Sequence, residues 1–455
     1  MNEAAFDACV DAHADEFLAQ LIELCRVPSV AAEGGPAMAR AAGLVSSLCR
    51  WAGVSADLVP TDGGPPIVLG QAGDGPRRLL IYNHYDVQPP DPLSEWLSPP
   101  FEPTVRDGIL YARGVADNKG NLVARLAAAR AYQETHGRLP LRLTFVLEGE
   151  EEVGSPHLDG FARAHADLLR AQEGCIWEAG YKDEDERPAA SLGLKGILAV
   201  ELHARTADVD AHSAAGGLYP NAIWRLTEAL STLRAADGTV LIDGLLDHVR
   251  PPTAAQMAML ERLPYDAAAV QRRMGIRGFL GGLTGVPALR RLMFEPTVTI
   301  NGILGGYTGP GSKTVIPSRA MAKLDIRLVP DLTPELALQL LRDHLARRGF
   351  DDVTVIPAEG GLMPARTDPS APIVGVVLAV LEEVYGVAPN VYPSMAGSGP
   401  MYQLCQAYGI PAISIGVGWA HSHTHAPNES VRVADFIAGI KVMGRVYGRF
   451  ADQVI

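Results

Sequence analysis

The chain has 455 residues, of which 47% are hydrophobic and 20% are charged, a balance typical of a globular protein. A chain of this length exceeds one ordinary hydrophobic core, so we expect two domains. The formal net charge of 39 − 52 = −13 argues against nucleic acid as a partner.

The N-terminal segment and the cysteines indicate in which cellular compartment the protein is expected. The opening residues, "MNEAAFDACVDAHADEFLAQL", are acidic and amphipathic, without the basic and then apolar pattern of a signal peptide. No stretch reaches the length of an apolar membrane span, so we expect no membrane partner. The five cysteines are scattered without a CxxC pair, which is typical of reduced thiols. Together these features predict a cytoplasmic protein.

The first 190 residues alternate between predicted helices and buried strands. The opening forty residues have a helical apolar rhythm, and a second helix follows to about Trp51. Two predicted strands with apolar centres, 77–87 and 141–155, the second of which ends in charge, flank a helix over 120–137. A strand, a helix and a second apolar strand in this order predict an α/β layer with a mostly parallel sheet.

The pattern changes after residue 190. The segments "ILAVELHARTA" and "AMAKLDIRLVP" alternate apolar and polar residues, as half-exposed strands do, and amphipathic helices accompany them. Thr333 is placed to cap the helix that begins near residue 334. We therefore expect an inserted α+β domain over 191–365. The parallel-sheet α/β domain would then consist of 1–190 and 366–455.

Ionisable residues follow the predicted apolar strands at several places, where an unpaired buried charge would be costly. They are His84, Asp86, Asp117, Glu148, Glu150, Glu151, Glu152 and Glu178. Ligands collect at the carboxyl ends of strands in open α/β sheets, so these side chains predict a metal site. Nitrogen and oxygen ligands without sulfur suit zinc, manganese or cobalt. Singly, each residue has a structural alternative: Asp117 as a helix cap, His84 as a core histidine, the glutamates as a solvated loop.

A further candidate segment is "WAHSHTHAPNE", residues 419–429, in which His421, His423 and His425 alternate. An extended chain would place all three imidazoles on one face. The segment alone leaves open which of the three binds a metal.

Six stretches together resemble the co-catalytic two-metal peptidases that include aminoacylase, carnosine dipeptidase, glutamate carboxypeptidase and bacterial desuccinylases. They are "NHYDVQP", "ARGVADNKG", "LEGEEEVGS", "DAHSAAGGLYPNA", "TVIPSRAMAKLDIRLVP" and "THAPNE", and they span about residues 80–430 in the family's order. The resemblance implies a catalytic domain with an inserted lid and dimerisation domain. It also implies two divalent ions per chain. Zinc is the expected metal, and manganese or cobalt are the alternatives.

The resemblance assigns roles to single residues. The implied metal ligands are His84, Asp117, Glu152, Glu178 and His425. Glu151 would be the general base, and Asp86 would orient the imidazole of His84. His421 and His423 would not bind the ions. The peptide bond between Asp117 and Asn118 is expected to be cis.

The implied substrate-binding residues are His212, Asn221, Thr314, Arg327 and Ser398. In many relatives the histidine matching His212 comes from the partner subunit, so a homodimer is expected. A guanidinium suits bidentate binding of a carboxylate, so Arg327 would hold the substrate's C-terminus. Without the resemblance, the sequence would suggest only structural roles: His212 as a histidine in a loop and Arg327 as a surface arginine on an alternating strand.

The expected function is a metal-dependent hydrolase, most simply a dipeptidase acting on small substrates with a free C-terminal carboxylate. An N-acyl amino acid deacylase is the alternative, because it uses the same chemistry. "SMAGSGP" stands where dipeptidase-like members carry a charged pair, which leaves the substrate open. The segment "GGYTGPGSKT" looks like a phosphate-binding loop, but Ser312 separates Gly311 from Lys313, which argues against a nucleotide-binding module.

Overall fold

The computed structural model describes residues 2–358 and 360–453, which form two compact units. Unit 1 comprises Met1–Gly193, Arg366–Pro393 and Pro400–Ile455, and unit 2 comprises Leu194–Ala365 and Ser394–Gly399. Within the described residues, no helix has the length and apolar character needed to cross a membrane.

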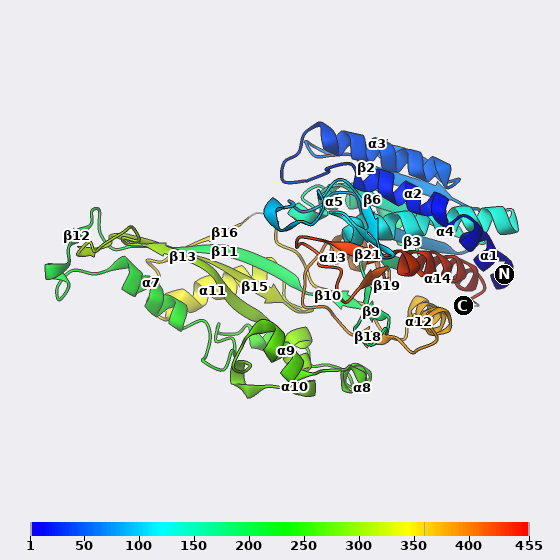
Figure 1. The fold of residues 1–455 in the computed structure, drawn as a ribbon. Coiled ribbons are helices and arrows are strands. Elements are labelled where there is room, and N and C mark those ends of the chain that lie inside the picture. Colours follow the sequence, from blue (N-terminus) through cyan, green and yellow to red (C-terminus); the bar gives the residue numbers. More distant parts are fainter. Residues whose placement is uncertain (1, 359, 454–455) are drawn as a thin grey trace. The chain divides into compact units, whose positions relative to one another are not determined.

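Unit 1 is built around an eight-stranded sheet (Figure 1). The strand order is β1 (Ser55–Val59), β2 (Ile67–Ala72), β6 (Arg142–Glu148), β3 (Arg78–His84), β7 (Cys175–Trp177), β19 (Ala412–Ser414), β9 (Ala189–Ser191) and β18 (Asn390–Tyr392). The central pairs β6–β3, β3–β7 and β7–β19 are parallel, as is β9–β18. The remaining pairs are antiparallel. The prediction of a mostly parallel sheet in a mixed α/β fold is confirmed.

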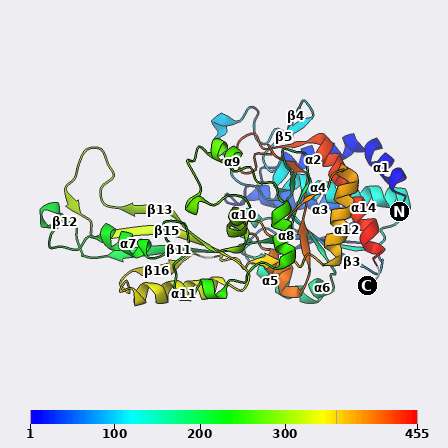
Figure 2. The same ribbon diagram turned by 90° about the horizontal axis from the view of Figure 1, so that it is seen from below.

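Helix α4 (Gly120–His136) is buried along most of its length. Its alanines are small enough to let neighbouring elements approach closely, and its leucines Leu122 and Leu126 are fully buried. Helix α14 (Val433–Ala451) packs against it and against α12 (Pro372–Tyr385). Helix α1 (Glu3–Ala12) lies beside α14 in Figures 1 and 2, and Asp7 pairs with Arg445 at 2.6 Å. The first and last helices of the chain are therefore neighbours.

The N-terminal region contains three helices, where the apolar rhythm predicted two. They are α1, α2 (Ala14–Cys25) and α3 (Pro36–Trp51). The break falls at His13, whose φ of −107° and ψ of 12° lie outside helical values. The smaller elements of unit 1 are β4 (Thr104–Arg106), β5 (Ile109–Tyr111), β8 (Tyr181–Lys182), β20 (Gly418–Trp419), β21 (Ser430–Arg432), α5 (Leu158–Ala164), α6 (Ala166–Arg170) and α13 (Met401–Leu404).

Unit 2 contains a four-stranded antiparallel sheet in the order β13 (Thr297–Gly305), β15 (Arg319–Leu328), β11 (Gly196–Arg205) and β16 (Thr354–Pro357). Burial alternates along β11 and β15, as the sequence predicts for half-exposed strands. Helices α7 (Ala222–Ser231) and α11 (Pro334–Arg347) cover the buried face (Figure 1). Thr333 caps α11 as expected, because its hydroxyl accepts a hydrogen bond from the Leu336 amide at 3.1 Å. The other elements are α8 (Ala254–Arg262), α9 (Ala267–Met274), α10 (Gly285–Phe294), β12 (Ala211–His212) and β14 (Val315–Ile316).

Candidate metal centre

The candidate residues of unit 1 lie at the carboxyl ends of its central parallel strands. His84 is the last residue of β3 and is paired in register with Glu148, the last residue of β6. Glu178 directly follows β7. Because these strands run in the same direction, their ends bring an imidazole and carboxyl groups to one edge of the sheet.

Glu151 and Glu152 lie beyond the end of β6, in the short 3-10 turn η3 (Glu151–Val153). The expectation that they belong to the strand over 141–155 is wrong, because β6 ends at Glu148. Gly154, which directly follows η3, has a φ of 89°, and the chain turns there. The turn aims both glutamates at the strand ends.

The first cluster centres on the Nε2 atom of His84. This atom lies 3.1 Å from Asp117 Oδ1 and 3.3 Å from Glu178 Oε2. On the other side of the ring, Nδ1 lies 3.2 Å from Asp86 Oδ1. Asp86 therefore contacts His84 as the sequence predicts, and the buried pair fixes the orientation of the imidazole.

The second cluster centres on the Nε2 atom of His425. It lies 3.2 Å from Asp117 Oδ2 and 3.2 Å from Glu152 Oε2. Asp117 is thus shared between the clusters, with one carboxylate oxygen facing each histidine. This is the arrangement in which one carboxylate can bridge two ions.

His421 and His423 are not arranged like His425. Residues 420–429 form turns, so the extended geometry that would align the three imidazoles does not occur. The ring of His421 lies edge-on to Trp419, with ring centroids 4.9 Å apart, and His423 is exposed. His423 and His425 both have a positive φ, 52° and 62°, and the ring of His425 is the one that lies 3.2 Å from Asp117 and from Glu152.

The donor set fits divalent ions. A tetrahedral zinc ion with bonds of about 2.0–2.1 Å separates its ligand atoms by about 3.3 Å, close to the distances in both clusters. Asp117, Glu151, Glu152 and Glu178 carry −4 together when ionised, which two divalent ions would balance. In addition, the buried Oε1 atom of Glu152 has no hydrogen-bond partner among the described residues.

The mutual approach of these groups shifts their pKa values. Burial would lower the pKa of His84, but Glu178, Asp117 and Asp86 together raise it well above its ordinary value. Hydrogen bonds to Asp117 and Glu152 raise the pKa of His425 to about 10. Burial raises the pKa of Glu178 to about 8. Burial also raises the pKa of Glu151 well above its ordinary value, and the proximity of Glu178 adds to the effect. The site concentrates negative charge, which a bound cation would relieve.

Glu429 holds the loop that carries Asp117, a role that sequence reasoning missed. Its buried carboxylate accepts hydrogen bonds from the amides of Gly114 and Ala116, both at 2.8 Å, and of Asp117 at 3.0 Å. Arg113 completes the arrangement with an ion pair at 2.8 Å. Glu429 is the final residue of "THAPNE", so its position after His425 is the available signal. The Asp117–Asn118 peptide is cis, as expected.

Two further side chains position the glutamate turn. Asp86 accepts hydrogen bonds from the amides of Glu151 at 3.3 Å and Glu152 at 3.0 Å. Gln88, also missed from the sequence, donates to Glu152 Oε2 at 2.9 Å. Asp86 thus supports both His84 and the turn that carries Glu151.

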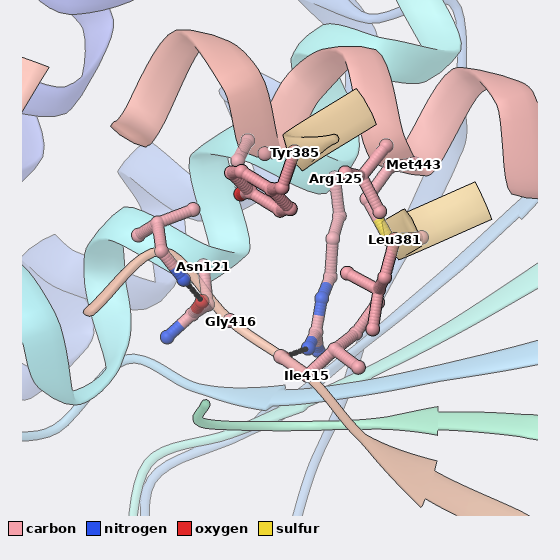
Figure 3. Close-up of a pocket in the computed structure, with 11 residues that line it drawn as sticks. Asn121, Arg125, Leu381, Tyr385, Ile415, Gly416 and Met443 are labelled. Atoms are coloured by element: carbon pink, nitrogen blue, oxygen red, sulfur yellow. Dashed lines mark hydrogen bonds between the residues drawn. The ribbon is translucent and has the colours of Figure 1, made fainter. Parts of the chain in front are cut away.

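Arg125 is hydrogen-bonded to three of the strand segments that lead to the site, and Figure 3 shows its hydrogen bond to Ile415. Its guanidinium donates to the carbonyls of Tyr82, Trp177 and Ile415 at 2.6–2.9 Å, which belong to β3, β7 and the residue after β19. It also lines a small cavity of about 20 Å³, enough for one water. A single buried cation therefore fixes the spacing of three strand ends.

Four of the five candidate residues of unit 2 form two pairs, and Asn221 lies apart from both. At one, His212 Nε2 lies 3.5 Å from Thr314 Oγ1, and both residues are exposed. At the other, Arg327 donates to Ser398 at 2.8 Å. Asn221 caps α7, with its side-chain oxygen accepting from the amide of Ile223 at 2.8 Å. The binding roles of all five remain predictions.

The fold and the donor set are typical of metal-dependent hydrolases, in which carboxylate and imidazole ligands hold two neighbouring ions. The chain belongs to peptidase family M20/M25/M40, whose model matches residues 80–449. The resemblance to the two-metal peptidases is confirmed.

Three relatives illustrate the similarity. The Beta-Ala-His dipeptidase of Rattus norvegicus is 27% identical, over 96% of this chain and 93% of that protein. The Cys-Gly metallodipeptidase dug1 of Schizosaccharomyces pombe is 28% identical, over 95% of each chain. The crystal structure of an M20 family metallo-carboxypeptidase from Sulfolobus solfataricus has a TM-score of 0.89 and 35% identity, and covers 96% of this chain and 100% of that one.

Proposed function

We propose that the protein is a dipeptidase that uses two divalent ions to hydrolyse the amide bond of small substrates with a free C-terminal carboxylate. The observation that supports this most directly is the shared carboxylate: Asp117 offers one oxygen to the cluster of His84 and Glu178 and the other to that of His425 and Glu152. The family and the names of the relatives support peptide hydrolysis.

The five proposed ligands are His84, Asp117, Glu152, Glu178 and His425. Zinc is the proposed metal, with manganese or cobalt as alternatives. Bound divalent ions would polarise the scissile carbonyl and make the attacking water more acidic. The carboxylate of Glu151 lies beside His84 and Glu178 without being needed as a ligand, which suits a group that must accept a proton and then release it. Its carboxylate takes the proton from the attacking water and passes it to the leaving nitrogen.

Arg327 is proposed to bind the substrate's C-terminal carboxylate. Ser398 fixes one end of its guanidinium and in turn donates to the carbonyl of Gly196 at 3.1 Å. An arginine with an anchored fork loses little freedom on binding a carboxylate. The side chain is about a third exposed, and its Nε atom lies 3.5 Å from Asp325 Oδ2, which holds the guanidinium from a second side.

Replacing Arg327 with alanine is expected to raise KM for free dipeptides about 10- to 100-fold, because a hydrogen bond to a charged group contributes about 1.5–3 kcal/mol. C-terminally amidated dipeptides should be poor substrates that the substitution barely affects. Steady-state kinetics on both substrate series measures this. Arg319→Ala, on the same strand, is the matched control and should leave KM unchanged. Equal hydrolysis of free and amidated dipeptides by the unaltered protein would rule out carboxylate recognition.

A carboxypeptidase acting on longer peptides is the second candidate, favoured by the 35% identity to the Sulfolobus metallo-carboxypeptidase. Both functions require a free C-terminus, so peptide length separates them. A dipeptidase should lose kcat/KM steeply from two residues to four, whereas a carboxypeptidase should retain it. The same panel should include N-acyl amino acids, whose preferred hydrolysis would identify a deacylase instead.

We further propose that unit 2 is the lid and dimerisation domain and that His212 serves the partner subunit's site. His212 lies beside Thr314, which comes before the first residue of β15, Arg319. Arg327 lies on the same strand, eight residues after Arg319. At about 3.4 Å per residue the strand covers about 27 Å between these arginines. An extended dipeptide spans about 7 Å, so His212 and Arg327 of one chain cannot both contact it.

Exposed apolar side chains support a dimer through unit 2. Trp224 on α7 is 67% exposed, and Ile303 and Leu304 on β13 are 57% and 65% exposed. Large exposed apolar side chains grouped on one domain are typical of protein interfaces. Figures 1 and 2 both show β12, which carries His212, beyond one end of the four-stranded sheet of unit 2.

Mixing inactive Glu151→Gln subunits with inactive His212→Ala subunits should restore activity, because one of the two sites in each mixed dimer has both residues. With random exchange, about half of the dimers are mixed, each with one intact site, so about a quarter of full activity is expected. Activity is measured after subunit exchange has been verified with two differently tagged subunits. No recovery in verified mixed dimers would show that His212 acts within its own chain or not at all.

The free cysteines support a location in a reducing compartment, and we propose the cytoplasm. All five are unpaired thiols, four of them buried. Disulfides persist mainly in oxidising compartments.

A further inference from the structure

A second group of metal-ligating side chains lies in unit 1, among residues that the proposed hydrolysis does not use. It consists of Cys9 on α1, His13 at the break between α1 and α2, and Glu134 near the end of α4. Cys9 Sγ lies 3.8 Å from Glu134 Oε2. His13 Nε2 lies 3.9 Å from Glu134 Oε2. One ligand atom from each residue lies within 4.8 Å of the others.

The imidazole of His13 is already oriented for a ligand role. Its Nδ1 lies 2.9 Å from the carbonyl oxygen of Cys9. A carbonyl can only accept a hydrogen bond, so Nδ1 carries the hydrogen and the lone pair is on Nε2. Metal-binding histidines commonly donate their other N–H to a backbone carbonyl in this way. The ring also stacks on Phe17, with centroids 6.0 Å apart, which further limits its rotation.

The carboxylate of Glu134 is held in a similar way. Arg130, one helical turn earlier, lies 3.0 Å from its Oε1 atom, which leaves Oε2 facing Cys9 and His13. Arg130 is itself fixed, because it donates to the carbonyl of Trp51 at 2.9 Å and lies over the Trp51 ring. Two of the three potential ligands therefore have a neighbour that sets their direction.

We propose that Cys9, His13 and Glu134 form a third metal site, which takes a zinc or cobalt ion with one thiolate, one imidazole and one carboxylate ligand. A tetrahedral zinc ion separates a sulfur and an oxygen ligand by about 3.5 Å and a nitrogen and an oxygen ligand by about 3.3 Å. The present sulfur–oxygen distance of 3.8 Å exceeds its value by about 0.3 Å and the nitrogen–oxygen distance of 3.9 Å by about 0.6 Å, differences that side-chain rotations can close. Binding converts the Cys9 thiol to a thiolate and releases its proton to solvent.

This site is separate from the candidate metal centre. Glu134 lies 14 residues along α4 from Gly120, the helix's first residue, which directly follows the loop of Asp117. At 1.5 Å per residue, α4 places about 21 Å between these positions. His13 and Glu134 have side chains 39% and 34% exposed, so an ion can exchange with solvent. A bound ion would link α1 and α2 to α4, and its expected role is to stabilise the N-terminal helices.

Cobalt substitution tests the proposal, because the ligands of the candidate metal centre contain no sulfur. Cobalt-loaded protein should show a near-ultraviolet thiolate-to-cobalt charge-transfer band, and Cys9→Ser should abolish it. Cys49→Ala, which removes a buried thiol from α3, is the matched control and should keep the band. The metal content measured after zinc loading should fall by one ion per chain in Cys9→Ser, with hydrolytic activity unchanged.

Glu134→Gln provides an independent variant that keeps the thiol, and it should shift or weaken the band. A cobalt-loaded protein without a thiolate band, or a band that persists in Cys9→Ser, would overturn the third site. Neither result would bear on the proposed hydrolysis, which depends on other residues.

Discussion

Replacing Glu151 with glutamine is expected to reduce kcat by at least about 10²–10⁴-fold, the range for loss of a general base. Glutamine has nearly the same size and can still donate and accept hydrogen bonds, but it cannot take a proton from water. The backbone amide of Glu151, which donates to Asp86, is retained, so the turn should keep its shape. Turnover of a dipeptide, measured after loading with zinc, manganese or cobalt, gives the comparison.

The metal content of Glu151→Gln should remain that of the unaltered protein, which separates loss of a base from loss of a ligand. Glu150→Gln is the matched control, since Glu150 is the adjacent glutamate and pairs with His157 at 2.6 Å. Near-normal turnover in Glu151→Gln would exclude it as the base. A loss of ions from this variant would instead make Glu151 a ligand.

Replacing Asp117 with asparagine is expected to lower the content of both ions at once, because its two carboxylate oxygens face different clusters. Asparagine offers one neutral oxygen in place of two charged ones. Activity should fall by more than the ~10–100-fold that loss of a supporting group around a metal typically costs. Elemental analysis after dialysis against a weak chelator measures the ions directly.

Two histidine variants sharpen this test. His425→Ala should remove the ion of the second cluster only, whereas His421→Ala, in the same segment, should leave both in place. If Asp117→Asn kept one ion at full occupancy, the carboxylate would not be a bridge. If His421→Ala lost an ion, the assignment of the last ligand to His425 would be wrong.

Elements with a clear apolar period could be predicted from the sequence. Strands β3 and β6, helix α4 and the Thr333 cap of α11 follow directly from the spacing of apolar residues and a polar cap. The break at His13 could not, because neither proline nor glycine interrupts the apolar rhythm there. The turn that carries Glu151 was also missed, because a run of charged residues after a strand does not specify where the strand ends.

The site could be predicted only as a set of residue types. The convergence of His84, Asp117 and Glu178 follows from parallel strands that end at one edge. The role of Glu429 depends on hydrogen bonds to a loop more than three hundred residues earlier in the chain. No local pattern reports such a contact, so Glu429 was visible only as the end of a motif.

The grouping of His425 and Glu429 with residues from the first half of the chain has a consequence for biosynthesis. His84, Asp117 and Glu178 leave the ribosome long before the C-terminal segment does, and domains generally fold as units in the order of synthesis. The Asp117 loop cannot gain its Glu429 support, nor the second cluster its histidine, until translation is almost complete. A peptide released before that point would lack both His425 and Glu429, so a prematurely terminated product should not hydrolyse dipeptides.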